Sequence, residues 1–248
     1  MNDRGIWASW HDLPEQGRDE HLAWLHGTYI PKILKKPGVL WGAHYANAKV
    51  PPNQWLRHTD DKSVPTGNDY ILLFGAETAH AFTTGWEFHA KQGINRREAG
   101  LTAEDRKMLA MRAGERRMIF TEEARGDGPE ARLRDAKGTP APVIQIGTFN
   151  SPGCDDELMS WYGDWRIPAL VKLPCTVGIR KLVSVVGWAR HAVLYEFASL
   201  QLREENMPKL RTIYKEEGAW SDAFTPKLIH APSSPVVGTR LWPAVERK

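Results

Sequence analysis

The sequence predicts an α+β protein made of two similar halves, each with the element order β-α-β-β-α-β. The first observation is an internal repeat: the segment from Asp19 to Pro37 returns as Asp156 to Pro174, which is 137 positions later (156 − 19 = 137). Seven of its 19 columns are identical, where unrelated segments would match at about one. The second observation is that strand-like and helix-like patterns follow one another in the same order in both halves. That order is the ferredoxin-like arrangement.

The first half is expected to span residues 1–125. Its predicted strands are Ile6–His11, Val39–Tyr45, Tyr70–Ala76 and Arg117–Glu123. Its first predicted helix begins after Arg18 and ends at Pro37-Gly38, and its second runs from Thr102 to about Ala113. In the first helix, Leu22, Leu25, Tyr29 and Ile33 recur at a helical spacing. Pro31 cannot donate a hydrogen bond to the carbonyl of the preceding turn, so a kink is expected there. A capping box at Thr102 opens the second helix.

Residues 126–142 are rich in glycine, proline and charge and carry no periodicity, which indicates a linker between the halves. The second half, residues 143–248, repeats the order of the first. Its predicted strands are Val143–Phe149, Thr176–Val183, His191–Ala198 and Val236–Trp242, and its helices are Asp156–Leu173, kinked at Pro168, and Glu204–Glu217. Two such halves can pair into one closed architecture. A structure of two separate lobes on a free linker would contradict this prediction.

The residues of the repeat carry a family resemblance. The second copy has Trp161-Tyr162, Arg166-Ile167-Pro168 and Arg180-Lys181, and the first has Trp24-Leu25, Tyr29-Ile30-Pro31, Pro37-Gly38 and Ala43-His44-Tyr45. This frame resembles the dimeric α+β barrel superfamily, and within it the EthD-like proteins, as does Glu217-Gly218-Ala219-Trp220 before the last strand. The resemblance implies an intramolecular, pseudo-dimeric α+β barrel. It also implies a small-molecule site between the sheet and its covering helices.

The departures from that frame are informative. The histidine expected before Ile-Pro is Tyr29 in one copy and Arg166 in the other, so any chemistry of that histidine is different here or has moved. The first copy holds His11 and His44 where the sequence alignment puts Thr148 and Lys181 in the second. Imidazole suits proton transfer near neutral pH better than a hydroxyl or an ordinary lysine. We therefore expect the working pocket in the first half.

His11, His44 and Tyr29 are the predicted catalytic residues. A histidine pKa near ~6.5 suits either imidazole to general acid–base chemistry. Tyr29 could donate a hydrogen bond to an oxyanion. Strand two is expected to lie beyond strand three, so the sequence leaves open whether His11 and His44 meet. The alternatives are solvated or capped histidines and a tyrosine that packs in the core.

The predicted substrate-binding residues are Trp10, Trp24, Trp41, Tyr45 and Arg166. Eleven tryptophans are many for this length, and a buried indole needs a partner for its N–H, which favours an aromatic-lined pocket. Arg166 could clamp a carboxylate or phenolate with its planar guanidinium. Trp24 could instead anchor the helix, and Arg166 could form a surface ion pair with a nearby aspartate.

Composition excludes several classes of function. A net charge of +3, with glutamates between the basic pairs, is typical of a solvated surface rather than a nucleic-acid interface. No apolar run approaches ~18 residues, and the N-terminus lacks a signal-peptide pattern, so no membrane partner is expected. Cys154 and Cys175 lack metal or redox spacing, which indicates reduced thiols and a cytoplasmic location. Nucleotide-binding, zinc-protease and nucleophile-elbow motifs are missing from the sequence.

The function predicted from these features is a lyase or isomerase without cofactor or metal, acting by His and Tyr acid–base chemistry. Its substrate would be a small hydrophobic molecule, aromatic or carbonyl-bearing, and a homodimer is conceivable. The resemblance adds cofactor-free monooxygenases and enzymes of aromatic compound metabolism as related activities. One alternative is haem binding through His191, His44 or His89. Another is a non-catalytic stress protein that sequesters an apolar ligand.

Overall fold

Eight antiparallel strands close into a barrel in the computed structural model, which describes residues 2–51, 55–83, 100–134, 138–210, 212 and 225–245. The strands of the first half are β1 (Gly5–Asp12), β2 (Val39–Asn47), β3 (Tyr70–Ala76) and β4 (Ala113–Asp127), and those of the second are β5 (Val143–Asn150), β6 (Thr176–Val186), β7 (His191–Phe197) and β9 (Val236–Trp242). Their order is β4-β1-β3-β2 in the first half and β9-β5-β7-β6 in the second. A short strand, β8 (Ile229–His230), adds to the end of β5.

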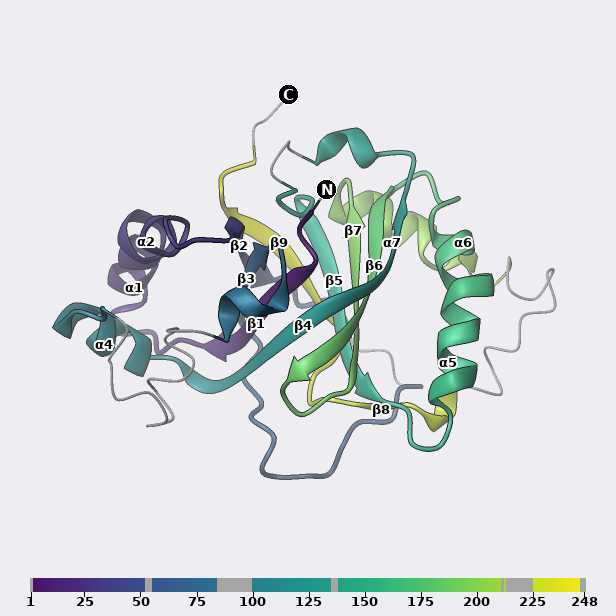
Figure 1. Ribbon diagram of the computed structural model, residues 1–248, viewed down its shortest axis with the longest axis horizontal. Helices are drawn as coiled ribbons and strands as arrows, with labels where there is room; N and C mark the ends of the chain where they lie inside the picture. The colour runs from purple at the N-terminus through teal and green to yellow at the C-terminus, as the bar shows by residue number, and fades with distance from the viewer. Residues whose placement is uncertain are drawn as a thin grey trace.

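Two seams join the halves into the barrel. At one seam β4 pairs with β6, for example Phe120 opposite Ser184, and at the other β2 pairs with β9, for example Tyr45 opposite Arg240. Figure 1 shows the N-terminal elements on one side, the C-terminal elements on the other and the strands between them. The predicted α+β barrel is therefore confirmed, and the halves are not separate lobes.

The barrel interior is filled by apolar side chains. Strand residues alternate, so that Ile6, Ala8 and Trp10 of β1 point into the barrel, while Trp7 packs against the helices outside. Trp41 also fills the barrel, opposite Gly75 of β3, where an added Cβ would lie 2.0 Å from the Trp41 ring. Glycine at that position makes room for the indole.

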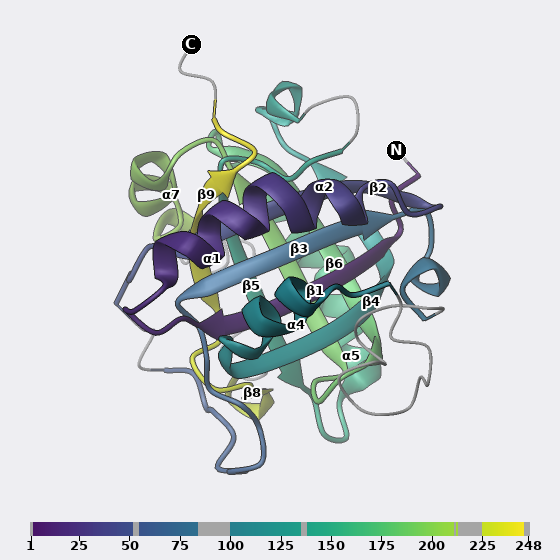
Figure 2. The same cartoon turned by 90° about the vertical axis from the view of Figure 1, so that its left-hand side faces the viewer.

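A long helix covers the outer face of each half. The first consists of α1 (Arg18–Trp24), a π-helical turn (Leu25–Tyr29) and α2 (Ile30–Ile33), and the second of α5 (Asp155–Trp161), a π-helical turn (Tyr162–Arg166) and α6 (Ile167–Leu170). Figure 2 shows the first of these and α4 (Ala103–Ala110) in front of the strands of the first half. The second packs on the opposite side of the molecule (Figure 1).

The disturbance predicted at Pro31 and Pro168 takes the form of these π-helical turns. The Ile30 N–H donates to the carbonyl of Leu25, and the Ile167 N–H donates to the carbonyl of Tyr162, each five residues back. Proline has no N–H to donate to the preceding turn, and a π-helical turn directly before it lets the helix continue without that hydrogen bond.

The two shorter helices bear on the sequence predictions in different ways. The capping box is confirmed: the Asp105 N–H donates to the Thr102 hydroxyl over 3.0 Å, and the Thr102 N–H donates to the Asp105 carboxylate over 2.8 Å. In the second half α7 (Leu200–Asn206) begins earlier than predicted, because the Ser199 hydroxyl accepts the Leu202 N–H and caps the helix. The rest of the predicted range overlaps residues 211 and 213–217, which lie outside the described residues.

Residues 126–142 are packed against the barrel in their described part. β4 extends to Asp127, and a 3₁₀ turn follows at Ala131–Leu133. Arg134 forms an ion pair with Glu196 over 3.0 Å, and the Tyr45 hydroxyl donates to the carbonyl of Ala141 over 3.0 Å. These contacts hold the connection to both halves.

Neither a membrane-spanning helix nor a disulfide bond is found among the described residues. Among the described helices, none combines the length and apolarity needed to cross a membrane. Cys154 and Cys175 are both buried free thiols, and burial raises the pKa of each.

Candidate functional site

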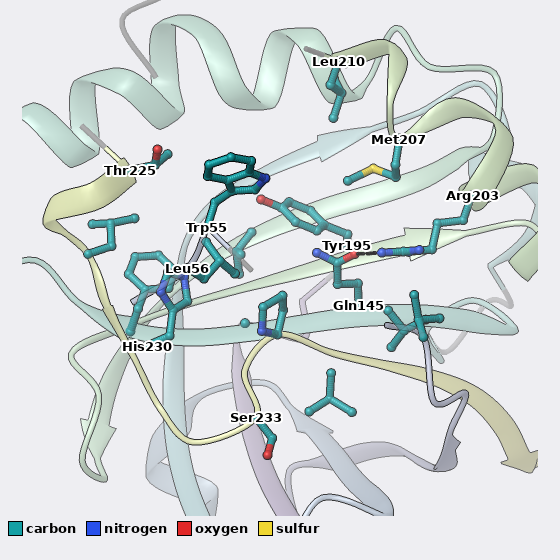
Figure 3. A pocket seen from close by; sticks show the side chains of 18 of the residues that line it. Trp55, Leu56, Gln145, Tyr195, Arg203, Met207, Leu210, Thr225, His230 and Ser233 are labelled. Carbon is teal, nitrogen blue, oxygen red and sulfur yellow. Dashed lines mark hydrogen bonds between the residues drawn. The ribbon is translucent and has the colours of Figure 1, made fainter. Parts of the chain in front are cut away.

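A cavity of about 960 Å³ lies in the second half, outside the barrel (Figure 3). Its floor is the outer face of β5, β7 and β9, and its walls come from the helix that begins with α5, from α7 and from the chain around β8. The apolar part of the lining includes Phe149, Trp161, Tyr162, Val193, Met207 and Leu228. The cavity is therefore the space between sheet and helices in which the family resemblance places a ligand.

The first half also contributes to this cavity. The chain after β2 crosses to the second half, where the Ala48 N–H donates to the carbonyl of Val237 over 2.8 Å. Val50 and Trp55 then line the cavity, and the Trp55 side chain is 78% exposed. An exposed indole on a cavity wall is available to pack on a ligand, because covering its apolar ring removes that surface from water.

Arg166 and Tyr195 form a polar pair on the cavity wall. The Arg166 Nε–H donates to the Tyr195 hydroxyl over 3.1 Å, and the guanidinium lies over the rings of Trp161 and Tyr195, 5.7 and 5.3 Å from their centroids. Arg166 is the last residue of the π-helical turn, directly before Ile167-Pro168. The predicted binding role of Arg166 is consistent with this placement and stays a prediction.

Gln145 and Arg203 form a second polar pair at the cavity. Both Nε–H and Nη2–H of Arg203 donate to the side-chain oxygen of Gln145, as the dashed line in Figure 3 marks. Gln145 is 7% exposed on β5, and Arg203 reaches it from α7. Burial lowers the pKa of Arg203, and neighbouring Glu204 opposes that effect.

His230 supplies an imidazole to the cavity lining. Burial lowers its pKa to about 4, so the ring is neutral near pH 7. Its Nδ1 lies 3.3 Å from the carbonyl of Arg57, and because a carbonyl can only accept, Nδ1 carries the proton. Nε2 is then the basic nitrogen. The ring packs against Phe149 with centroids 5.3 Å apart.

The structure brings His11 and His44 together in the first half, beneath α1. Their rings are stacked, with centroids 6.2 Å apart, and the Nδ1 of His44 lies 2.9 Å from the Nε2 of His26. Burial lowers the pKa of His44 well below its ordinary value, with the nearby His26 and Arg112 adding to the effect. Burial also lowers the pKa of His26, which is half-buried and reaches the surface.

Further polar groups extend this histidine cluster, which we define as His11, His21, His26 and His44. The Ser9 hydroxyl lies 3.3 Å from His11 Nδ1 and donates to the Glu115 carboxylate over 2.9 Å. The pKa of His21 falls to about 4, first through burial and then through Arg112. The cluster is thus a set of buried imidazoles with one partly exposed member.

The other predicted site residues lie elsewhere. Tyr29 is 2% exposed and packs against Trp24, with ring centroids 4.8 Å apart, in the core between helix and sheet. Trp10, Trp41 and Tyr45 fill the barrel interior. The predicted set is therefore divided between the histidine cluster with its adjoining core, the barrel interior and the cavity of the second half. Its functional roles stay predictions.

The register of the strands corrects one equivalence drawn from the sequence. His11 pairs with Tyr70, and Phe149 pairs with His191, so Phe149 rather than Thr148 occupies the place of His11. The connection from strand to helix is one residue shorter in the second half, from Asn150 to Asp155, than in the first, from Asp12 to Arg18. Thr148 consequently shares the barrel-facing side of β5.

Lys181 does stand where His44 stands in the first half. Its Nζ lies 3.0 Å from His191 Nδ1, and His191 Nε2 lies 3.0 Å from the Asp155 carboxylate. Burial lowers the pKa of Lys181 to about 8, although Glu123 and Asp155 oppose this. Lys181 has no exposed surface. We therefore assign a structural role to the contacts that run from Lys181 through His191 to Asp155.

The histidines considered as haem ligands do not fit that role in the described residues. His191 has both ring nitrogens engaged, and His44 has no exposed surface. His89 lies outside the described residues. The described part of the chain also holds no cluster of three or more His, Cys, Asp or Glu side chains suited to a metal ion.

The cavity residues that sequence reasoning did not identify include Gln145, Tyr195, Arg203 and His230. Gln145 and Tyr195 interrupt the apolar pattern of their strands with polar groups, and this was the sequence signal that could have indicated a site there. Arg203 and His230 reach the cavity only through tertiary packing, which no local sequence pattern predicts.

Comparisons with known proteins support the fold. No protein-family model matches the chain, and no curated protein matches its sequence. A candidate monooxygenase from Fusobacterium nucleatum is similar in structure at 9% identity, with a TM-score of 0.57, covering 97% of this chain and 94% of that one. A candidate chlorite dismutase has 13% identity and a TM-score of 0.56, over 96% and 95% of the two chains. An anthrone oxidase-like protein has 9% identity and a TM-score of 0.61, over 97% and 92%.

These identities are low, so the likeness concerns the fold. Over nearly their full lengths these chains share the α+β barrel fold of this chain.

Proposed function

We propose that this protein is an enzyme that binds a small, largely apolar molecule in the cavity of the second half and acts on it by acid–base chemistry. The observation that carries the proposal is the cavity itself, about 960 Å³, whose lining combines aromatic and aliphatic side chains with polar ones such as Gln145, Arg166 and His230. Ligand sites of small molecules typically enclose ~300–1,000 Å³ and combine apolar walls with few polar groups. The similar structures include a candidate monooxygenase and an anthrone oxidase-like protein, whose names agree with a small-molecule enzyme.

His230 and Tyr195 would carry the chemistry. The Nε2 of His230 is neutral and basic near pH 7, since the pKa of this imidazole is lowered to about 4. Arg166 donates to the oxygen of the Tyr195 hydroxyl, which leaves the hydroxyl hydrogen for an oxygen of the ligand. In an isomerase or lyase, His230 would take a proton from carbon beside a carbonyl and Tyr195 would stabilise the resulting enolate oxygen. The proton would then return from His230 to another atom of the same substrate.

The test begins with the ligand that the protein retains through purification, identified by native mass spectrometry. Turnover of that molecule and of its close analogues is then measured for the wild type, His230→Ala and Tyr195→Phe. Losses of turnover in both variants, with binding retained, support the proposal. Variants that change affinity alone favour a ligand carrier, and full turnover in both removes the cavity as the active site.

The histidine cluster of the first half is the second candidate for the acid–base site, through His11 and His44 with Tyr29. The contact of 2.9 Å between His26 and His44 favours it, because it links a buried imidazole to a partly exposed one. In this version the proton leaves the substrate to the partly exposed His26, which the buried His44 orients through the hydrogen bond between them. A large loss of turnover in His44→Ala, with none in His230→Ala, would select this site.

We also propose that the halves arose by tandem duplication of an EthD-like unit. Each half has the same strand order, and each long helix has a π-helical turn directly before Ile-Pro. The identical residues of the repeated segment, from Asp19 to Pro37 and from Asp156 to Pro174, support the same history.

A further inference from the structure

We infer that the ligand of the cavity is an aromatic molecule with an anionic group, and that Arg203 together with Gln145 binds this group. The inference rests on the proposed function, because it names the chemical class of the molecule that the cavity accepts. It is drawn from the charge balance around one guanidinium.

Two buried guanidiniums elsewhere in the molecule have carboxylate partners. Arg180 contacts Asp3 over 2.9 Å and Glu122 over 2.6 Å, and Arg134 contacts Glu196 over 3.0 Å. Such pairing is expected, because an uncompensated charge is costly away from water.

Arg203 differs from these residues in its partner. Its Nε–H and Nη2–H both donate to the neutral amide oxygen of Gln145, and within the described residues it forms no ion pair. Burial lowers the pKa of Arg203, which is the direction expected for a cation that lacks a close anion. Glu204, its neighbour on α7, also lines the cavity but does not pair with it.

Arg203 lies where a bound ligand would contact it. Arg203, Gln145 and Tyr195 project into the same cavity in Figure 3. A ligand anion there would provide the missing negative charge, and the amide group of Gln145 would add a second donor. A guanidinium fork binds carboxylate and sulfonate-like groups with two hydrogen bonds.

The remaining wall selects the rest of the ligand. Trp55, Phe149 and Tyr195 present aromatic rings to the cavity, and such rings pack favourably on flat, unsaturated molecules. An aryl carboxylate or a phenolate would therefore satisfy both the aromatic wall and the guanidinium.

The experiment compares two fluorescent probes with the same naphthyl-aniline frame. One is 8-anilinonaphthalene-1-sulfonate, which is anionic, and the other is N-phenyl-1-naphthylamine, which is neutral. Dissociation constants are measured for the full chain as wild type, Arg203→Met and Gln145→Glu, with Arg132→Met as the control at an exposed cation outside the cavity lining. Gln145→Glu leaves Arg203 in place but supplies an internal carboxylate to compete with the probe.

The expected result is a loss of about 10-fold or more in affinity for the anionic probe in both cavity variants, the size expected for a charged hydrogen bond. The neutral probe should bind within about 2-fold in all proteins, and the control should bind both probes like the wild type. If Arg203→Met fails to fold, Gln145→Glu decides the question on its own.

Equal affinity of the anionic probe in wild type and Gln145→Glu, with the neutral probe still bound, would overturn this inference and leave the cavity as a binding site. If the wild type binds neither probe, both the inference and the proposed ligand site fail.

Discussion

The Nε2 of His26 lies 2.9 Å from the Nδ1 of His44, and this contact joins a partly exposed imidazole to one with no exposed surface. One ring nitrogen must donate and the other accept, so when both rings are neutral one N–H lies in this contact and the other ring carries its proton on its second nitrogen. Burial lowers the pKa of both residues, and that of His21 beside them falls to about 4. His21, His26 and His44 are therefore uncharged in the folded protein near pH 7.

Acidification is expected to destabilise the protein through these histidines. Above about pH 6.5 they are neutral in the folded and the unfolded state, so they do not change the free energy of unfolding. Below that pH the unfolded chain takes up protons that the folded chain does not, and stability falls until the pH reaches the folded-state pKa, about 4 for His21. Each such histidine contributes a slope of up to about 1.4 kcal/mol per pH unit. Urea unfolding between pH 7.5 and about 4 measures it.

A pair of variants assigns this slope. His21→Leu should make the free energy of unfolding fall less steeply with acid, whereas His80→Gln, at an exposed position, should leave the slope as in the wild type. The same slope in wild type and His21→Leu would show that the cluster does not govern acid stability.

Asp3 is expected to be one of the most sensitive positions for stability. Its carboxylate accepts from Arg180 over 2.9 Å and from the Trp41 indole over 2.9 Å, and this ties the N-terminus to the second half. Asp3→Ala leaves the Arg180 guanidinium buried with fewer partners, and loss of one member of a buried pair costs about 3–5 kcal/mol. The exposed pair between Glu20 and Lys107 serves as the control, where Glu20→Ala should cost at most about 1 kcal/mol. Chemical denaturation of both variants gives the comparison.

Two tyrosine variants separate the candidate sites. Tyr195→Phe keeps the ring of Tyr195 but removes the hydroxyl that accepts from Arg166. Turnover of the identified substrate should fall about 10²–10³-fold, as for a lost oxyanion donor. Tyr29→Phe is the matched change in the first half and should retain turnover within about 3-fold. The reverse order of effects would place the chemistry at the histidine cluster.

His230→Ala should lower turnover about 10²-fold or more, the lower end for loss of a general base. Because the pKa of His230 is lowered to about 4, the wild-type kcat/KM should decline only when the pH approaches that value and the imidazole takes up a proton. A pH profile of kcat/KM measures this limb. An acid limb centred near 6.5 instead would show that another group, with an unperturbed pKa, is the base.

The sequence predicted the strands well because their patterns are local. Tyr70–Ala76 and Val236–Trp242 are observed as predicted, and the barrel follows from two halves of the same order. It also picked out His11 and His44 as candidates but left open whether they meet, and the structure stacks their rings with centroids 6.2 Å apart.

The cavity could not be predicted in the same way. Trp55, Arg203 and His230 come from segments far apart in the sequence, and they meet only because β2 continues into a chain that crosses to the second half. Trp10 and Trp41 were expected to bind substrate, yet the alternation of strand residues turns both into the barrel. The connection from strand to helix is also one residue shorter in the second half. For this reason Phe149, and not Thr148, occupies the place of His11.

The central claim is that the ligand binds in the cavity of the second half. A crystal structure of the protein with N-phenyl-1-naphthylamine tests it most directly, because this neutral probe requires none of the proposed charged contacts. If the ligand binds in this cavity, electron density for the naphthyl ring will lie between the floor at Phe149 and Tyr195 and the walls at Trp55 and His230. Density beneath α1 beside His44, with the cavity of the second half empty, would contradict it.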